Sequence, residues 1–140
     1  MPEVLDKYEL LARLAKGGMG EVFLARQKGA AGFEKIVVVK TLLAALSEEQ
    51  EFINMFFDEA RIAAALNHPN IAQVYDLGEV KGRHFIAMEY VHGENLREVM
   101  IEGWEQAALT LGLTARIIAD AAGALEHAHT ATNRAGRPLD

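Results

Sequence analysis

The sequence contains no cysteine, which excludes disulfide bonds and thiolate metal sites. It has no block of basic residues, and its formal net charge of −6 argues against a nucleic-acid-binding protein. The longest apolar runs, 36–39 and 42–46, are too short to span a bilayer, and residues 1–3 lack the basic start of a signal peptide. These absences predict a cytoplasmic domain that binds neither nucleic acid nor membrane through this segment.

Alternating and β-branched segments predict the strands of an antiparallel sheet. Residues 8–14 and 21–26 alternate in polarity on either side of a glycine-rich segment, and 34–40 is rich in valine and isoleucine. Residues 71–77 and 84–90 form a predicted hairpin whose turn is expected between Gly78 and Gly82. We therefore expect five strands.

The remaining periodic segments predict helices. Apolar residues recur every three to four positions over 50–66, after a capping-box pattern that starts at Ser47. A short helix is expected over 94–102, a longer one over 114–129, and a loop over 133–138. A shift in composition near Gly93 marks a domain boundary, with one domain over 1–92 and a second over 93–140. A sheet with a helix packed on it places the fold in the α+β class.

The glycine-rich segment Lys16-Gly17-Gly18-Met19-Gly20 has several possible meanings. A dinucleotide-binding loop leads into a helix, whereas residues 21–26 alternate like a strand. A P-loop ends in Gly-Lys-Ser or Gly-Lys-Thr, and neither tripeptide occurs in this chain. Two interpretations stay open: a glycine hairpin whose backbone covers a phosphate, and an ordinary β-hairpin turn.

Two charged residues favour the phosphate interpretation. Lys40 ends an apolar strand and shares a face with Ile36 and Val38, where an ammonium group needs an anionic partner. Glu59 lies close to the apolar stripe of the helix predicted over 50–66 and could be that partner. Each side chain on its own could equally be a solvated surface charge. The glycine-rich segment, Lys40 and Glu59 follow one another in the order that a phosphate-binding site requires, and their occurrence together favours such a site.

In these motifs the chain resembles the N-terminal part of bacterial serine/threonine protein kinases of the eukaryotic type. Residues 16–22 resemble the phosphate-covering loop, 38–40 the strand that carries the phosphate-contacting lysine, and 58–61 the C helix with its glutamate. Residues 67–71 resemble the His-Pro-Asn-Ile segment of the family, and 114–129 its E helix.

The resemblance implies ATP as the ligand and assigns roles to individual residues. Lys40 would orient the α- and β-phosphates and Glu59 would hold Lys40 as an ion pair. Met88 would be the gatekeeper, the backbone of Glu89 and Val91 would bind adenine, and Glu94 or Asn95 would lie near the ribose. The ATP-binding residues implied in this way are Leu14, Ala15, Lys16, Gly17, Gly18, Met19, Gly20, Glu21, Val22, Val38, Lys40, Met88, Glu89, Val91, Glu94 and Asn95. Ala15 replaces the first glycine of the family's loop, and Val38 stands where alanine is frequent.

The resemblance also implies what these 140 residues lack. The family's catalytic loop and its Asp-Phe-Gly metal motif follow the E helix, and no His-Arg-Asp or Asp-Phe-Gly sequence occurs in this chain. We therefore expect 1–92 to be a kinase small lobe and 93–140 the start of a large lobe that is catalytically incompetent alone. Magnesium and a protein substrate are expected only in the complete kinase. The alternative is a non-catalytic nucleotide-binding or kinase-docking module, which could self-associate through exposed helices of the large lobe.

Overall fold

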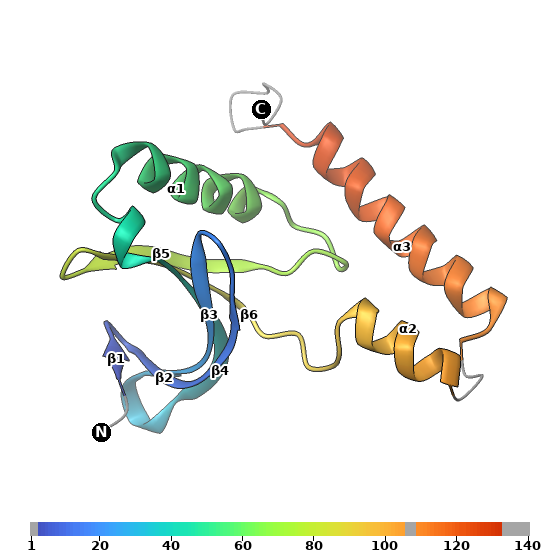
Figure 1. The fold of residues 1–140 in the computed structure, drawn as a ribbon, viewed down its shortest axis with the longest axis horizontal. Helices are drawn as coiled ribbons and strands as arrows, with labels where there is room; N and C mark the ends of the chain where they lie inside the picture. The colour runs from blue at the N-terminus through green and yellow to red at the C-terminus, as the bar shows by residue number, and fades with distance from the viewer. Residues whose placement is uncertain (1–2, 106–108, 133–140) are drawn as a thin grey trace. The chain divides into compact units, whose positions relative to one another are not determined.

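The structure, a computed structural model, describes residues 3–105 and 109–132. It divides into two compact units (Figure 1). The first comprises Met1–Ala65 and Ala72–Tyr90, and the second comprises Leu66–Ile71 and Val91–Asp140. The loop predicted over 133–138 lies outside the described residues.

The first unit contains a curled antiparallel sheet with one helix, α1, packed on it (Figure 1). Its described residues form six strands in the order β1-β2-β3-β4-β6-β5. The strands are β1 (Val4–Leu5), β2 (Tyr8–Lys16), β3 (Gly20–Lys28), β4 (Glu34–Leu42), β5 (Val74–Val80) and β6 (Arg83–Glu89). The α+β class predicted from the sequence is confirmed.

Two predicted features of the sheet are wrong in detail. The sheet has a sixth strand because Val4–Leu5 folds back on β2 through a tight turn in which Asp6 has a φ of 54°. Two residues are too few to show a periodic pattern. The β5–β6 turn is at Lys81-Gly82, with φ values of 52° and 77°, as a two-residue hairpin with two positive φ angles requires. Gly78 instead lies inside β5, where a side chain would overlap the ring of Phe85.

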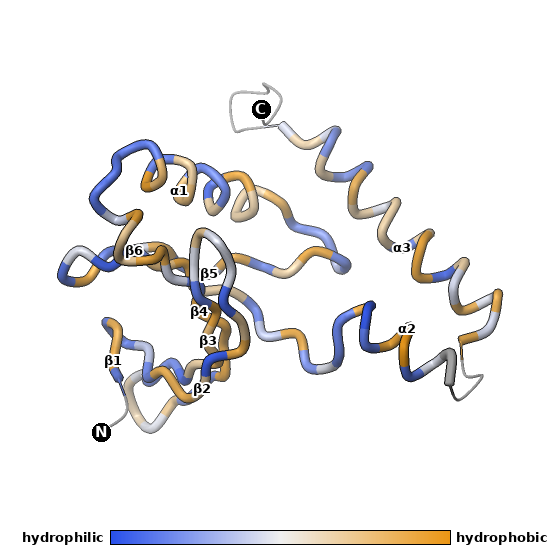
Figure 2. Tube along the Cα trace, viewed as in Figure 1, coloured by the Kyte–Doolittle hydropathy of each residue, from blue (hydrophilic) through white to orange (hydrophobic). Residues whose placement is uncertain are grey.

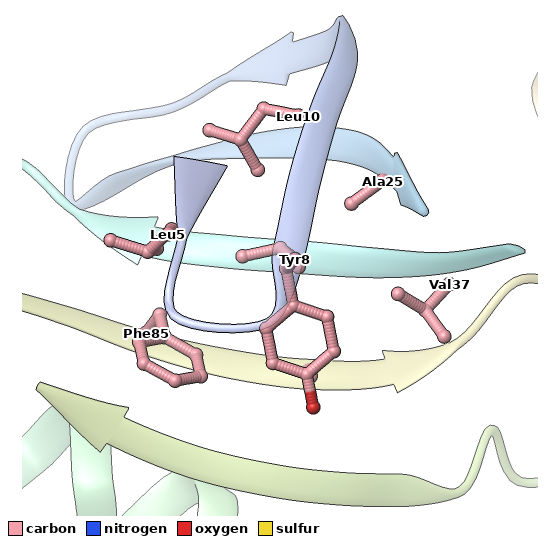
Figure 3. Packing of buried hydrophobic residues seen from close by; sticks show 8 residues of the cluster. Leu5, Tyr8, Leu10, Ala25, Val37 and Phe85 are labelled. Atoms are coloured by element: carbon pink, nitrogen blue, oxygen red, sulfur yellow. The ribbon is translucent and has the colours of Figure 1, made fainter. Parts of the chain in front are cut away.

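The inside of the curl is filled by apolar side chains from five strands (Figure 3). Tyr8 and Phe85 meet edge to face at a centroid distance of 5.6 Å, and Val37 and Ala25 belong to the same buried cluster. Alternate residues of β4 contribute to this core, so that Val37 and Val39 are fully buried while Val38 and Lys40 face the other way. The core thus fixes the face on which Lys40 lies.

A polar cluster closes the curl between β2 and β5, which are far apart in the strand order. The buried hydroxyl of Tyr8 donates to Asp76 Oδ2 at 3.0 Å, and Lys7 Nζ lies 2.7 Å from the same oxygen. Burial is the larger cause and the hydrogen bond to Asp76 the second, and together they raise the pKa of Tyr8 to about 12. Burial alone would raise the pKa of Asp76, but hydrogen bonds from Lys7 and Tyr8 outweigh it and the pKa is lowered.

Helix α1 (Gln50–Ala65) packs on β5 and β6 through Phe56 and Ala60, which join Leu42 and Ile86 in a second core. The predicted capping box is wrong. The Ser47 hydroxyl donates to the carbonyl of Leu43 at 3.1 Å, within the turn after a short 3₁₀ helix at Ala44–Leu46, and α1 begins only at Gln50.

The second unit contains helices α2 (Leu96–Glu105) and α3 (Leu111–Thr130). Helix α2 begins and ends later than the predicted range 94–102, and α3 extends beyond the predicted range 114–129 at both ends. The hydroxyl of Thr110 caps α3 by accepting from the backbone N–H of Leu113 at 3.2 Å. Figure 2 shows apolar and polar residues alternating along α3. None of the helices in the described part of the chain is long and apolar enough to cross a membrane.

We predict that the Tyr8 hydroxyl makes the fold sensitive to alkali. A raised folded-state pKa keeps the phenol protonated, so its stabilisation is complete below the unfolded value of 10.0 and is lost as pH rises towards about 12. Tyr8→Phe should cost about 1 kcal/mol near neutral pH. The parent loses about 2 kcal/mol across this window and Tyr8→Phe does not, so the advantage of the parent should disappear and the order of the two should reverse, measured by urea unfolding.

The exposed Tyr75 provides the matched control, since Tyr75→Phe should keep the alkaline decline of the parent. A constant difference between parent and Tyr8→Phe at all pH values would contradict the role given to this hydroxyl.

Candidate functional site

The glycine-rich segment forms the tip of the β2–β3 hairpin, and β3 begins at Gly20. Gly17 N–H donates to the carbonyl of Gly20 at 2.8 Å, which closes the tip. Leu43 N–H donates to the carbonyl of Met19 at 3.0 Å, which ties the tip to the end of β4. The segment therefore runs strand–turn–strand, and the sequence argument against a dinucleotide-binding loop is correct.

Two glycines of this tip have opposite surroundings. A side chain on Gly20 would overlap the carbonyl oxygen of Thr41 on the neighbouring strand, whereas Gly18 has open space on the side where a Cβ would lie. Gly20 is thus required for the close approach of β3 to β4. The exposed backbone at Gly18 leaves room for a ligand to approach it closely.

Lys40 and Glu59 are brought together on one side of the sheet. Lys40 Nζ donates to both carboxylate oxygens of Glu59, at 2.7 and 2.9 Å, and its ammonium lies 5.8 Å from the centre of the Phe56 ring. The Lys40 side chain is 25% exposed and that of Glu59 is 58% exposed. The pair is open to solvent, so it adds little to stability, and its main effect is to fix the position of the ammonium group.

The strand register places other predicted residues beside Lys40. Val22 is the cross-strand partner of Lys40, and Val38 lies between Leu24 and Met88. Val22, Val38 and Met88 are all half-buried. Paired residues share a face of a sheet, so one apolar strip borders the ammonium group.

The predicted hinge and ribose residues are divided between the two units. Glu89 N–H donates to the carbonyl of Gln73 at 2.8 Å in the first unit. Val91, Glu94 and Asn95 are exposed residues of the second unit. Asn95 begins helix α2 there, because its side-chain oxygen accepts from the backbone N–H of Glu98 at 3.1 Å. The structure therefore gives Asn95 a helix-capping role.

Sequence reasoning missed a cluster of charges at the base of the glycine tip. Glu21 Oε1 lies 3.0 Å from Arg13 and 3.5 Å from Lys16, and the pKa of Glu21 is lowered, mainly by the hydrogen bond from Arg13. No local signal could have found it, because Arg13 is paired with Phe23, and Lys16, the partner of Glu21, lies beyond the predicted strand 8–14.

A cavity of about 600 Å³ opens elsewhere in the first unit, away from the Lys40 ammonium. Its lining residues are Glu21, Leu42, Ala44, Ser47, Glu48, Lys81, Gly82 and Arg83. Because none of the predicted ligand-contacting residues except Glu21 lines it, the face that carries Lys40, Val22 and Val38 remains the candidate site.

Residues 3–105 and 109–132 contain no group of three histidine, aspartate or glutamate side chains placed to hold a metal ion. What they offer to a ligand is a cation, an apolar strip and an exposed glycine backbone, which match an anionic group joined to an apolar ring.

A glycine hairpin, a lysine on the next strand and a helix glutamate that binds this lysine are typical of the nucleotide-binding lobe of protein kinases. Comparison with known proteins agrees, because residues 8–133 match the protein kinase domain family. The chain belongs to the protein kinase family, and it corresponds to the N-terminal part of the kinase domain.

Individual relatives are bacterial kinases. The tyrosine-protein kinase MasK of Myxococcus xanthus is 45% identical over 134 residues, and the serine/threonine-protein kinase PknJ of Mycobacterium tuberculosis is 37% identical over 126 residues. A crystal structure of the Mycobacterium tuberculosis PknI kinase domain is 34% identical and superposes on 92% of this chain with a TM-score of 0.71.

The relatives are considerably longer than this chain. The match covers 95% of this chain but 21% of MasK, 90% of this chain but 20% of PknJ, and 51% of the PknI kinase domain. The chain therefore spans about a fifth of the curated relatives and about half of a solved kinase domain.

We predict that the two tip glycines respond differently to alanine. Gly20→Ala should destabilise the fold by about 1–3 kcal/mol, because the new methyl group forces β3 away from the backbone of Thr41. Gly18→Ala should change stability by less than about 0.5 kcal/mol, since its Cβ meets open space. Urea unfolding measures both, and equal losses would contradict the close approach at Gly20.

Proposed function

We propose that this chain is the ATP-binding part of a serine/threonine protein kinase. The observation that carries this proposal is the bond of Lys40 Nζ to both oxygens of Glu59. On the adjacent strand the partner of Lys40 is Val22, which lies at the base of the glycine tip. The pair holds an ammonium group in one position beside an apolar strip. A triphosphate with an attached purine has the charge and shape to use both.

Each element would make a separate contribution to binding. Lys40 would attract the α- and β-phosphates, and Glu59 would keep its ammonium from turning into solvent. The backbone at Gly17, Gly18 and Gly20 would cover the phosphates, while Leu14, Val22, Val38 and Met88 would contact the adenine ring. ATP supplies the γ-phosphoryl group that the complete kinase would transfer.

The two compact units correspond, in this proposal, to the small lobe and the beginning of the large lobe. The hinge would join them, with Glu89 on one side and Val91 on the other, and Glu94 or Asn95 would lie near the ribose. This chain contains no His-Arg-Asp or Asp-Phe-Gly sequence. We infer that residues 1–140 bind nucleotide but transfer no phosphoryl group, and that magnesium is held in the complete kinase.

The acceptor of the complete kinase is proposed to be a serine or threonine hydroxyl of a cytoplasmic protein. The names of the relatives differ here, because PknJ is a serine/threonine kinase and MasK a tyrosine kinase. The residues that select the acceptor hydroxyl follow the E helix in this family. The choice of serine or threonine therefore rests on the names of the serine/threonine relatives.

A non-catalytic binding module is the second candidate function, and an apolar groove of the second unit favours it. The groove lies between α2 and α3, and its lining residues are Leu96, Met100, Leu109, Thr114, Ile117 and Ile118. Leu96, Met100 and Ile118 are more than half exposed, at 51%, 53% and 63%. Exposed apolar surface of this kind is a site for self-association or for a partner protein.

We predict that nucleotide binding depends on Lys40. Lys40→Met should weaken binding of a fluorescent ATP analogue to residues 1–140 by about tenfold or more, because a charge-assisted contact to phosphate is lost. Glu59→Gln should weaken it less, since the ammonium remains but is no longer fixed. The matched control is Lys35→Met on the same strand, whose ammonium lies over the Tyr75 ring and which should leave affinity unchanged. Equal affinity of Lys40→Met and the parent would remove Lys40 from the site.

We also predict that purified residues 1–140 transfer no labelled γ-phosphate to protein or to water, with or without Mg²⁺. The reason is the missing catalytic loop. Phosphate release that disappears in Lys40→Met would contradict this expectation, whereas release that persists would indicate a contaminating enzyme.

A further inference from the structure

Glu21 connects the two sides of an irregularity in β2. The pairing of β2 with β3 shifts by one residue between Arg13 and Ala15, which is the geometry of a β-bulge. Arg13 precedes this bulge and Lys16 follows it. Glu21 Oε1 lies 3.0 Å from the first and 3.5 Å from the second, so one carboxylate spans the bulge.

The bulge lies close to the glycine tip, with only the pairs Ala15–Val22 and Lys16–Glu21 between them. A bulge bends its strand and increases the local twist, so its geometry sets the direction in which Gly17 and Gly18 continue. The other end of the tip is already fixed, because Leu43 N–H binds the carbonyl of Met19 and Gly20 packs against Thr41. The β2 end is joined to Gly20 by the bond from Gly17 N–H, but no side chain packs on it, since residues 11–18 are all exposed.

Glu21 does not face the candidate nucleotide site. Val22 is paired with Lys40 and shares its face, and successive side chains of a strand point to opposite faces. The Glu21 side chain is 20% exposed on the other face, and it keeps its charge because the Arg13 hydrogen bond lowers its pKa. Any effect on a nucleotide must therefore act through the backbone of the tip.

We propose that Glu21 is a positioning residue for the phosphate-covering tip: by binding Arg13 and Lys16 across the bulge, it holds the Gly17-Gly18 backbone over the phosphates. The inference rests on the proposed ATP binding and deepens it. It predicts an effect on phosphates and none on the nucleoside, because the tip covers the phosphates alone.

The same hairpin contains a matched control. Glu9 forms a comparable cluster at the far end of the two strands, with Lys28 Nζ at 2.9 Å and Arg26 at 3.9 Å, and its side chain is 15% exposed. Both carboxylates bridge β2 and β3, and both have a lowered pKa. The main cause is a hydrogen bond from Lys28 for Glu9 and a hydrogen bond from Arg13 for Glu21. They differ in their distance along the strands from the glycine tip.

The test compares Glu21→Gln, Glu9→Gln and Lys40→Met in residues 1–140, by titration with ATP and with adenosine. Glu21→Gln should raise the dissociation constant for ATP about two- to fivefold, as expected for loss of a partly exposed ion-pair cluster, and leave that for adenosine unchanged. Glu9→Gln should leave both constants unchanged. Arg13→Met removes the same link and should reproduce the Glu21→Gln result, which provides a second variant if the first fails to fold.

The outcomes separate this inference from the proposed function. If Lys40→Met weakens ATP binding and neither Glu21→Gln nor Arg13→Met does, the positioning role is wrong and the ATP site stands. If Glu21→Gln weakens ATP and adenosine equally, or Glu9→Gln has the same effect, the cluster is merely structural and the inference is overturned. If Lys40→Met has no effect, the proposed ATP site itself is wrong.

Discussion

The ion pair between Lys40 and Glu59 depends on two independent packing arrangements, and the candidate site depends on the pair. The buried core of Val37 and Val39 turns Lys40 to the opposite face of β4. The packing of Phe56 and Ala60 against Ile86 sets the rotation of α1, which directs Glu59 to the same face. Since a pair this exposed contributes little free energy, the two cores position the charges and not the reverse.

Much of the fold could be predicted from the sequence because its cores follow simple periods. Alternation located β2 and β3, the β-branched residues located β4, and the three-to-four-residue period located α1. Failures occurred where short-range chemistry competes with the pattern. Ser47 has the sequence of a helix cap, but its hydroxyl bonds back to Leu43. The sequence places Gly78 in a turn, but it lies in a strand, where a side chain would overlap the Phe85 ring.

The candidate site could be predicted only in part. The pairing of Lys40 with Glu59 followed from the need of a lysine on an apolar face for an anion, and the structure contains it. The closure of the curl by Tyr8 and Asp76 could not be predicted, because these residues are 68 positions apart and no local pattern joins them. The Glu21 cluster depends on a bulge, and a bulge changes which residues face each other across two strands.

The central claim is that the sheet and α1 hold Lys40 where it meets the phosphates of ATP. A crystal structure of residues 1–140 with a non-hydrolysable ATP analogue tests this most directly. The account predicts an α- or β-phosphate oxygen within hydrogen-bond distance of Lys40 Nζ, with Glu59 still bound to it and the Gly17-Gly18 backbone above the phosphates. A nucleotide bound elsewhere, or one whose phosphates avoid Lys40, would contradict it.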